Sequence, residues 1–325
     1  MARNKKILIK RLLGVFLAGF IFINIVAAFH AYRFTHFSTS DSKKTNSPEK
    51  LSFLSKLTVL AFGIDNPRPG NSSKPAYSFE TINLQSNKRI ECWYVHNNSS
   101  ANNSSAKGTV ILFHGYSGEK STLLFKSDQF LKLGYNTLLV DFMGSGGSEG
   151  NQTTLGFKEA YEVKTAFDYL TRKGETNIYL FGSSMGAVAI LKAIHDLHLT
   201  PRAIIIECPF GSMYQTTCAR FKLMNAPAFP MAGLLMFWGG LENGFWAFGH
   251  NPITYAKKVN CATLLLYGAQ DKNVSRQEIN DIYHNLNGPK LLKIYSLAGH
   301  EDYLIKYSNE WIKDVKEFLS ANNGS

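Results

Sequence analysis

Near its centre the sequence reads Ile178-Tyr179-Leu180-Phe181-Gly182-Ser183-Ser184-Met185-Gly186, an apolar run that ends in a turn of glycine and serine. The turn fits the pattern G-x-S-x-G, with Ser184 in the middle, and an alanine-rich helical pattern follows it. Glycines two positions to either side of a serine permit the strained strand-to-helix turn that exposes a hydroxyl as a nucleophile. The pattern alone is weak, because a chain rich in glycine and serine matches it by chance. Its place between a strand and a helix is what points to Ser184 as a nucleophile.

Apolar runs alternate with amphipathic stretches on both sides of this turn. The runs lie at 109–113, 137–141, 178–181, 203–207, 263–267 and 291–295, and the helical stretches lie around 121–133, 157–171, 187–197, 276–286 and 302–319. Continuous runs of Leu, Ile and Val are typical of a parallel sheet that is buried on both faces. Residues 79–95 add an antiparallel pair at the start. The alternation therefore predicts an α/β fold with a mostly parallel, doubly wound sheet.

Polar residues follow the carboxyl ends of the predicted strands, which is where open α/β sheets carry their sites. Asp271 follows the fifth of the six runs, and His300 follows the sixth through a turn of small residues. An imidazole can take the proton of a serine, and a carboxylate can orient that imidazole. We therefore expect Ser184, Asp271 and His300 to form a catalytic triad. Glu207, at the end of the fourth run, is the alternative acid.

The loop His114-Gly115-Tyr116-Ser117-Gly118 follows the first of these runs. Backbone N–H groups in such loops stabilise the oxyanion that forms when a serine attacks a carbonyl. We expect the N–H groups of Tyr116 and Met185 to form this oxyanion hole. His114 is expected to be structural, because it ends a strand in a loop that acts through its backbone.

The order of these residues along the chain, Ser184, then Asp271, then His300, is the order of the triad in α/β-hydrolases. Over about residues 76–320 the chain resembles the α/β-hydrolase superfamily, and in particular its serine-aminopeptidase-like and lipase-like branches. The matching motifs are His114-Gly115-x-x-Gly118, Gly182-x-Ser184-x-Gly186, Asp271, Gly299-His300 and the loop Asp141-Phe142-Met143-Gly144-Ser145-Gly146-Gly147-Ser148-Glu149-Gly150. This last loop is similar to D-x-R-G-x-G-x-S-x-G, with Met143 where arginine is usual.

The resemblance implies a serine hydrolase that cleaves carboxylic esters or thioesters through an acyl-enzyme, with no metal and no organic cofactor. It also implies a cap at about residues 211–256, between two strands of the sheet. This segment is rich in methionine and aromatic residues, so we expect an apolar pocket for a small-molecule or lipid-like ester, with Met236, Phe237 and Trp246 in its wall. The four cysteines are widely spaced and show no metal-ligand pattern.

Two other functions are compatible with the same motifs. A serine aminopeptidase-type exopeptidase would need a carboxylate for the amine of its substrate, and the cap offers only Glu242. A non-catalytic binding protein of the same fold usually lacks a member of the triad, and all three candidates are present here.

The net charge of +11 is concentrated at the N-terminus, because residues 1–56 carry ten Lys or Arg and two Asp or Glu. The rest of the chain is nearly balanced, so no nucleic-acid partner is expected. Residues 1–11 form a basic tail, and 12–29 are eighteen uncharged residues that would rise about 27 Å as a helix. We expect a transmembrane anchor with the tail in the cytoplasm and the catalytic domain outside it, followed by a tether at 30–75. The alternative is a signal peptide cleaved at Val26-Ala27-Ala28, which would leave a secreted or periplasmic protein.

Overall fold

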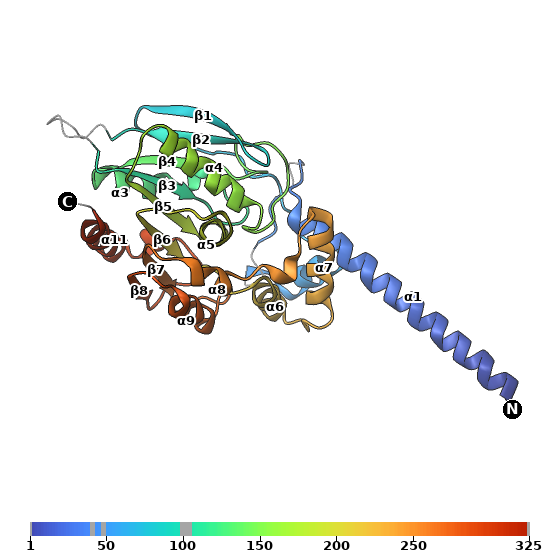
Figure 1. The fold of residues 1–325 in the computed structure, drawn as a ribbon. Coiled ribbons are helices and arrows are strands. Elements are labelled where there is room, and N and C mark those ends of the chain that lie inside the picture. Colours follow the sequence, from blue (N-terminus) through green and yellow to red (C-terminus); the bar gives the residue numbers. More distant parts are fainter. Residues whose placement is uncertain (1, 40–42, 47–49, 98–105, 324–325) are drawn as a thin grey trace.

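An eight-stranded sheet forms the centre of the protein in a computed structural model that describes residues 2–39, 43–46, 50–97 and 106–323 (Figure 1). Its strands are β1 (Phe79–Gln85), β2 (Arg89–Val95), β3 (Thr109–Phe113), β4 (Asn136–Val140), β5 (Ile178–Ser183), β6 (Ala203–Glu207), β7 (Ala262–Gly268) and β8 (Lys290–Tyr295). The strands lie in the order β1-β2-β4-β3-β5-β6-β7-β8. Strand β2 pairs antiparallel with β1 and with β4, and the other neighbours are parallel. The predicted α/β fold, with a mostly parallel sheet and an antiparallel pair at 79–95, is confirmed.

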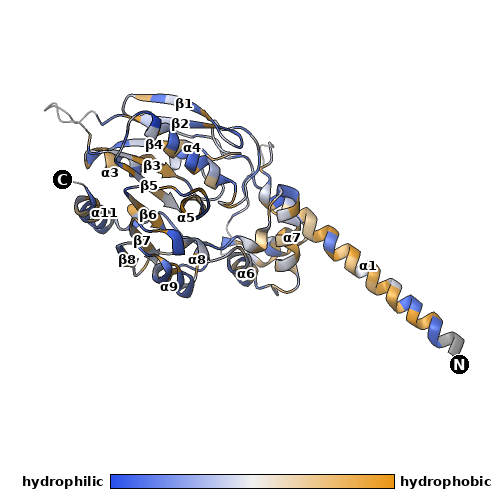
Figure 2. Ribbon diagram, viewed as in Figure 1, coloured by the Kyte–Doolittle hydropathy of each residue, from blue (hydrophilic) through white to orange (hydrophobic). Residues whose placement is uncertain are grey.

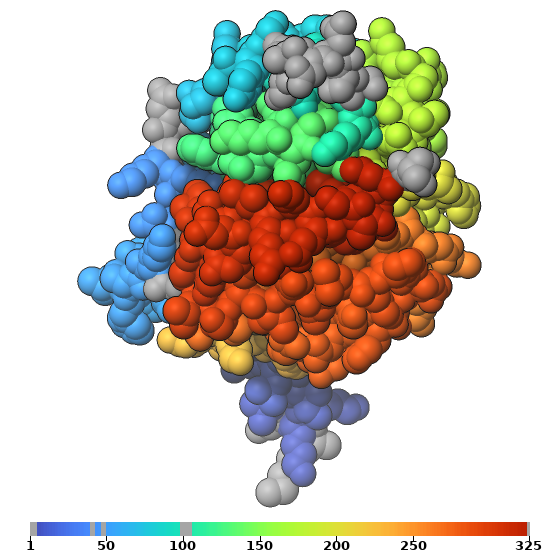
Figure 3. All heavy atoms as spheres, turned by 90° about the vertical axis from the view of Figure 1, so that its left-hand side faces the viewer, coloured from blue at the N-terminus to red at the C-terminus, as the bar shows by residue number. Residues whose placement is uncertain are grey.

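Helices cover both faces of this sheet. One apolar core lies under α4 (Glu159–Arg172), α5 (Met185–Leu197), α8 (Pro252–Tyr255), η4 (Ala256–Lys258) and α9 (Arg276–Asn285). The other lies under η2 (Lys120–Leu123), α3 (Leu124–Lys132), α10 (Tyr303–Lys306) and α11 (Ser308–Asn322), the last of which crosses the face shown in Figure 3. Because both faces are covered, β3, β6 and β7 are buried along their whole length. This double burial is the reason that their sequences are continuous apolar runs.

The register of the parallel strands brings their carboxyl ends to one edge of the sheet. Phe113 of β3 lies opposite Gly182 of β5, and Ser183 of β5 lies opposite Glu207 of β6. The loops after β3, β5, β6, β7 and β8 therefore leave the sheet side by side. These loops carry the predicted site residues.

A helical cap is inserted between β6 and β7. It consists of α6 (Met213–Met224), α7 (Met231–Asn243) and η3 (Ala247–Gly249), and it ends where α8 returns the chain to the sheet. Ser212 caps the start of α6, where its Oγ accepts a hydrogen bond from the N–H of Gln215 at 3.2 Å. These elements lie within the segment 211–256 that the sequence assigns to a cap.

Helix α1 (Ala2–Thr35) is longer than the anchor predicted at 12–29. Its first part projects away from the rest of the protein and is largely apolar (Figures 1 and 2). The segment Lys5–Thr35 is long and apolar enough to cross a membrane, judged by length and composition. Residues of the basic tail continue the helix at one end. At the other end the helix extends past Phe29 because the next turns pack on the cap.

The last turns of α1 lie along α7. Ala27 and Ala31 are buried there, and a Cβ placed on Gly239 of α7 would lie 3.7 Å from the Cβ of Ala31 and 3.9 Å from Cγ2 of Thr35. Small residues at intervals of four allow two helix backbones to approach closely. The end of the predicted anchor is therefore part of the folded body.

The prediction of a tether at 30–75 is wrong for those residues of the segment that the structure describes. Besides the end of α1, the segment contains α2 (Phe53–Phe62). Lys56 Nζ donates a hydrogen bond to the carbonyl of Leu223 in α6 at 2.7 Å. Arg68 Nη1 donates another to the carbonyl of Gly146 at 2.9 Å. The Ser, Thr and Lys content suggested a solvated linker, but these contacts fix the segment to the body.

Candidate active site

Ser184 occupies the sharp turn between β5 and α5. Its backbone angles, φ 49° and ψ −109°, cost a residue other than glycine on the order of 1–3 kcal/mol. A Cβ on Gly182 would come within 2.6 Å of the Ala187 nitrogen, and one on Gly186 within 2.4 Å of the Phe113 carbonyl oxygen. Both positions are therefore closed to any side chain. The two glycines allow strand and helix to meet tightly, with Ser184, which is half-buried, at the turn between them.

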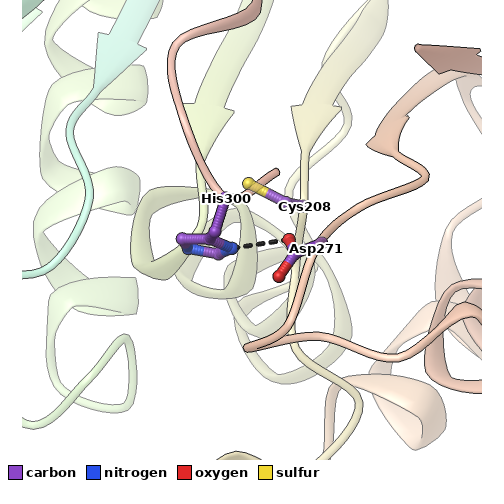
Figure 4. A group of neighbouring side chains, drawn as sticks. All are labelled: Cys208, Asp271 and His300. Carbon is purple, nitrogen blue, oxygen red and sulfur yellow. Dashed lines mark hydrogen bonds and ion pairs between the residues drawn. The ribbon is translucent and has the colours of Figure 1, made fainter. Parts of the chain in front are cut away.

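His300 joins Ser184 to Asp271 through two hydrogen bonds. Its Nδ1 lies 2.7 Å from Asp271 Oδ2, and its Nε2 lies 3.0 Å from Ser184 Oγ. Figure 4 shows the imidazole and the carboxylate side by side, with Cys208 next to them. Since Nδ1–H donates to the carboxylate, Nε2 can accept the hydroxyl proton of Ser184. The structure thus brings the three candidate triad residues together from the ends of β5, β7 and β8.

The backbone of its own loop orients Asp271. Its Oδ1 accepts hydrogen bonds from the N–H groups of Asn273 at 2.8 Å and Val274 at 2.9 Å, and its side chain is fully buried. These bonds fix the carboxylate and leave Oδ2 for His300. The acid is held in place before any substrate arrives.

The surroundings of His300 favour its charged form. Burial disfavours the imidazolium, but the Cys208 sulfur and the Asp271 carboxylate beside it outweigh burial and raise the pKa of His300 well above its ordinary value. A raised pKa makes the neutral imidazole a stronger base toward the hydroxyl of Ser184. It also means that this base is neutral only at higher pH.

Cys208, Asp271 and His300 are the one group of three potential metal ligands among the described residues. Their ligand atoms lie within 4.8 Å of one another. The 2.7 Å between His300 Nδ1 and Asp271 Oδ2 is the length of a direct hydrogen bond. These two atoms are bonded to each other and are therefore not available to a metal ion. A structural zinc site also takes four ligands. The geometry therefore fits the triad better than a metal site.

Glu207, the alternative acid, bonds to other partners. Its Oε2 accepts a hydrogen bond from Ser183 Oγ at 2.9 Å, and its Oε1 accepts one from Trp311 Nε1 at 2.8 Å. Burial raises the pKa of this carboxyl, while the Lys126 ammonium at 3.5 Å opposes the shift. Within the described chain no hydrogen bond connects Glu207 to His300. Its contacts instead support the turn before Ser184.

The backbone N–H groups of Tyr116 and Met185, near Ser184, have no hydrogen-bond acceptor among the described residues. Met185 begins α5, and the first N–H groups of a helix lack partners within it. Gly115 brings the loop after β3 against the serine, because a Cβ there would lie 3.7 Å from the Cβ of Ser184. Both donors thus belong to residues next to the hydroxyl.

His114 connects two loops through its ring nitrogens. Nε2 accepts a hydrogen bond from the N–H of Phe142 at 3.1 Å, so Nδ1 carries the proton and donates to the carbonyl of Gly115 at 2.8 Å. Burial lowers the pKa of this histidine, which keeps the ring neutral. These contacts agree with the structural role expected for it.

A cavity of about 600 Å³ is lined by Ser184 and His300, by the end of α1, by residues between 44 and 66 and by the cap. Of the three predicted pocket residues, Met236 lines this cavity. The assignment of Phe237 and Trp246 is wrong, because neither lines it and their side chains are 44% and 65% exposed. Successive residues of a helix point about 100° apart, so a helix that turns Met236 inward turns Phe237 away. Trp246 follows the end of α7 and faces solvent.

Helix α1 and Arg220 also contribute to this wall, and neither was expected there from the sequence. Ala31, Phe34 and Thr35 line the cavity, and the guanidinium carbon of Arg220 in α6 lies 4.6 Å from the centre of the Phe34 ring. One signal was available, namely the small residues at every fourth position, Ala27, Ala31 and Thr35. Such spacing is typical of a helix that packs closely on another helix.

A serine carried on a strand-to-helix turn of a mostly parallel sheet, with a histidine and an acid delivered by later strands, is the arrangement of the α/β-hydrolases. The chain has the fold and the site arrangement of this superfamily, and it is a hydrolase. The model of the family described as serine aminopeptidase, S33, matches residues 104–236.

Relatives and solved structures agree with this assignment. YqkD, an uncharacterized protein of Bacillus subtilis (strain 168), is 29% identical over 225 residues, which are 67% of this chain and 72% of that protein. The lysophosphatidylserine lipase ABHD12 of Danio rerio is 24% identical over 239 residues, 67% of this chain and 59% of that lipase. The esterase Pf2001 of Pyrococcus furiosus superimposes with a TM-score of 0.65 at 22% identity, covering 79% of this chain and 97% of its own. At this identity the structural likeness establishes the fold.

Proposed function

We propose that this protein is a membrane-anchored serine esterase that cleaves lipid-like carboxylic esters or thioesters. The observation that carries the proposal is the chain of hydrogen bonds Asp271–His300–Ser184, which ends at a hydroxyl in the wall of a cavity of about 600 Å³. A cavity of this size accommodates a small organic ligand. The catalytic roles below follow from that geometry.

In the proposed mechanism, Ser184 Oγ attacks the carbonyl carbon of the ester while His300 Nε2 takes the hydroxyl proton. Asp271 holds the imidazole in the required tautomer and stabilises its positive charge. The N–H groups of Tyr116 and Met185 stabilise the oxyanion, and a single donor of this kind contributes about 3 kcal/mol. The tetrahedral intermediate then expels the alcohol, which receives the proton from His300. Water, activated by the same base, releases the acid from the acyl-enzyme.

The composition of the cavity wall favours an ester with an apolar acyl chain. Ala31 and Phe34 from α1, Met236 from α7, and Leu155 and Phe245 add apolar surface around the serine. Each methylene buried against such a wall contributes about 0.8 kcal/mol. The names of two similar proteins, an esterase and a lysophospholipid lipase, agree with this substrate class.

An aminopeptidase activity is less well supported, although the matching family model carries that description. Recognition of a peptide amine requires a free carboxylate, and the acids of the cavity wall are already paired with cations. Glu242, the cap carboxylate that the sequence offered for this role, does not line the cavity. The comparison of substrates below separates the two activities.

We infer that α1 anchors the enzyme in a membrane, with the catalytic domain outside the cytoplasm and residues 1–11 inside. The side chains along its outer part are apolar and exposed, for example Val15 at 72% and Phe16 at 74%. Further exposed apolar side chains lie near the point where α1 joins the body, on α2 and around α7, among them Phe53, Leu54, Phe62, Phe229 and Leu241. Such a surface is suited to rest against lipid.

The packing of α1 favours an uncleaved anchor over a signal peptide. Cleavage after Ala28 would remove Ala27, which is fully buried against the body. It would also remove Asn24, whose Oδ1 accepts a hydrogen bond from Trp238 Nε1. Because residues of the segment 12–29 pack against the folded body, we infer that the segment is retained.

The proposed activity is tested with p-nitrophenyl esters of increasing acyl length and with aminoacyl-p-nitroanilides, using the full-length protein in a nonionic detergent. We expect kcat/KM to rise by up to about fourfold for each added carbon until the cavity is full. Faster turnover of the anilides, or no dependence on acyl length, would favour the peptidase. No turnover of any substrate, together with no labelling of the protein by a fluorophosphonate, would indicate a non-catalytic binding protein.

A further inference from the structure

Each acidic side chain in the wall of the active-site cavity lies beside a cation, and two of the four share one ammonium group. Asp65 lies 2.5 Å from Arg33, and Glu301 lies 2.8 Å from Lys306. The remaining two, Glu207 and Asp302, lie 3.5 Å and 2.6 Å from the same ammonium group, that of Lys126. The negative charges of the wall therefore have local partners.

Two cations of the same wall have no such partner. Arg220 and Lys44 line the cavity, and neither lies within ion-pair distance of a carboxylate in the described part of the chain. Lys44 Nζ donates a hydrogen bond to the carbonyl of Ser117 at 3.0 Å. No hydrogen bond from the Arg220 guanidinium to another described residue is formed. The two unpaired cations, Lys44 and Arg220, outnumber the one carboxylate left over at Lys126, so the net charge of these groups and their partners is positive.

Aromatic rings fix the position of Arg220. Its guanidinium carbon lies 4.6 Å from the centre of the Phe34 ring and 5.5 Å from that of Tyr116. These two rings stack on each other, with centres 4.7 Å apart and planes inclined by 8°. A guanidinium held over a ring uses its face, and its N–H groups remain free at the edge. Arg220 is therefore held in place while its donors stay available.

The apolar surroundings of Arg220 disfavour a guanidinium that has no anionic partner. Burial lowers the pKa of Arg220, because an apolar wall disfavours the charged form. A buried cation is normally compensated by an anion or by hydrogen bonds. The described protein residues supply neither for Arg220, which is half-buried, so its donors are open to the cavity and an anionic group of the substrate can reach them. The planar edge of a guanidinium matches the two oxygens of a phosphate or a carboxylate.

We propose that Arg220 is the specificity-determining residue for an anionic oxyacid group, phosphate or carboxylate, in the polar part of the ester substrate, and that Lys44 adds to the attraction. This inference rests on the proposed esterase function and narrows its substrate class. Tyr116 links the two sites, because its ring contacts Arg220 and its N–H is proposed to bind the oxyanion. The acyl chain then lies along the apolar wall while the anionic group is bound at Arg220.

The test uses three esters with the same oleoyl chain, each at low mole fraction in micelles of dodecyl maltoside, so that the surface charge of the micelle is constant. They are 1-oleoyl-lysophosphatidylglycerol, which carries a phosphate, 3-O-oleoylglycerate, which carries a carboxylate, and neutral 1-oleoylglycerol. We expect the full-length enzyme to prefer at least one anionic ester over 1-oleoylglycerol by about 10-fold or more in kcat/KM. The comparison of the two anionic esters shows whether the enzyme prefers a phosphate or a carboxylate.

Substitution of the arginine then tests the assignment. Arg220→Gln is expected to lower the ratio of kcat/KM for the preferred anionic ester to that for 1-oleoylglycerol by about 10- to 100-fold, mainly through KM, as for the loss of a charge-assisted hydrogen bond. Arg220→Lys keeps the charge but not the planar edge, so we expect an intermediate ratio. Lys222→Gln is the matched control, because Lys222 is an exposed residue of the same helix outside the cavity wall. Its ratio should equal that of the wild type.

The outcomes separate this inference from the proposed function. Turnover of 1-oleoylglycerol without preference for either anionic ester would overturn the role of Arg220 and leave the esterase intact. An equal loss of kcat/KM on all three esters in both Arg220 variants would also overturn this role, because such a loss would show that Arg220 is needed for the structure and not for specificity. Absence of turnover by the wild type on all of the esters would refute the proposed function itself.

Discussion

Trp238 Nε1 in the cap donates a 3.1 Å hydrogen bond to Asn24 Oδ1 in helix α1. Asn24 is the strongest polar interruption in the apolar segment 12–29, and this contact explains why a polar residue stands there. A side-chain amide facing lipid without a partner is costly, but here the indole satisfies it. The helix and the cap therefore form one structural unit.

From this packing we predict that residues 12–29 stay in the mature protein as a single span. Extraction with alkaline carbonate should leave the protein in the membrane pellet, and protease added from outside the cell should digest the catalytic domain. N-terminal sequencing provides the independent check. A mature chain that begins at Phe29 would show that the segment is a cleaved signal peptide.

We predict that Ser184 is the only serine of its turn that reacts with a fluorophosphonate. Ser184→Ala should abolish labelling because it removes the attacking oxygen. Ser183→Ala is the neighbouring control and should still be labelled, since the hydroxyl of Ser183 is directed to Glu207 at 2.9 Å. Labelling that persists in Ser184→Ala would refute the assignment of the nucleophile.

Asp271→Asn should lower kcat by about 10³- to 10⁴-fold, because an amide no longer holds His300 in the productive tautomer. Glu207→Gln is the comparison, and it should cost much less activity because Glu207 contacts Ser183 and Trp311 and has no bond to His300. Thermal denaturation of both variants checks that they fold. If Glu207→Gln alone gave the large loss, the acid would be misassigned.

The pH dependence of kcat/KM follows from the raised pKa of His300. The base acts only when it is neutral, so activity should fall as the pH drops through this pKa, with a midpoint above 6.5 in the free enzyme. Asp271→Asn removes the carboxylate that raises this pKa and should move the midpoint of the residual activity to lower pH. Cys218→Ala, on α6 and away from the triad, should leave it in place. A wild-type midpoint below 6.5 would contradict the electrostatic argument.

The sheet and the triad could be predicted from the sequence because their signals are local. Strands such as β3 and β6 are buried on both faces, so their apolar runs coincide with their observed bounds. Asp271 follows the buried strand β7 and His300 follows the edge strand β8, and parallel strands bring their carboxyl ends to one edge. The sequence alone could not decide between Asp271 and Glu207, because Glu207 ends one strand and Asp271 follows another. The hydrogen bond from His300 to Asp271 distinguishes them.

The wall of the cavity could not be predicted in the same way. Composition identified the cap as apolar, but it did not indicate which face of α7 turns inward: Met236 lines the cavity and Phe237 does not. The contribution of α1 depends on contacts between residues about 200 positions apart, such as Ala31 and Gly239. Arg220 belongs to no sequence motif. Its proposed role follows from the ion pairs of the cavity wall, which leave its charge without a partner.

Because Ala31 and Phe34 lie in the cavity wall, helix α1, the proposed membrane anchor, also forms part of the proposed substrate pocket. Truncation before the catalytic domain, the usual route to a soluble enzyme for screening, would delete one side of the pocket and expose Tyr116, which stacks on Phe34. Substrate preferences measured on such a fragment would describe a wider and more open pocket than the native one. Inhibitor discovery against this enzyme therefore calls for the intact chain in detergent or nanodiscs.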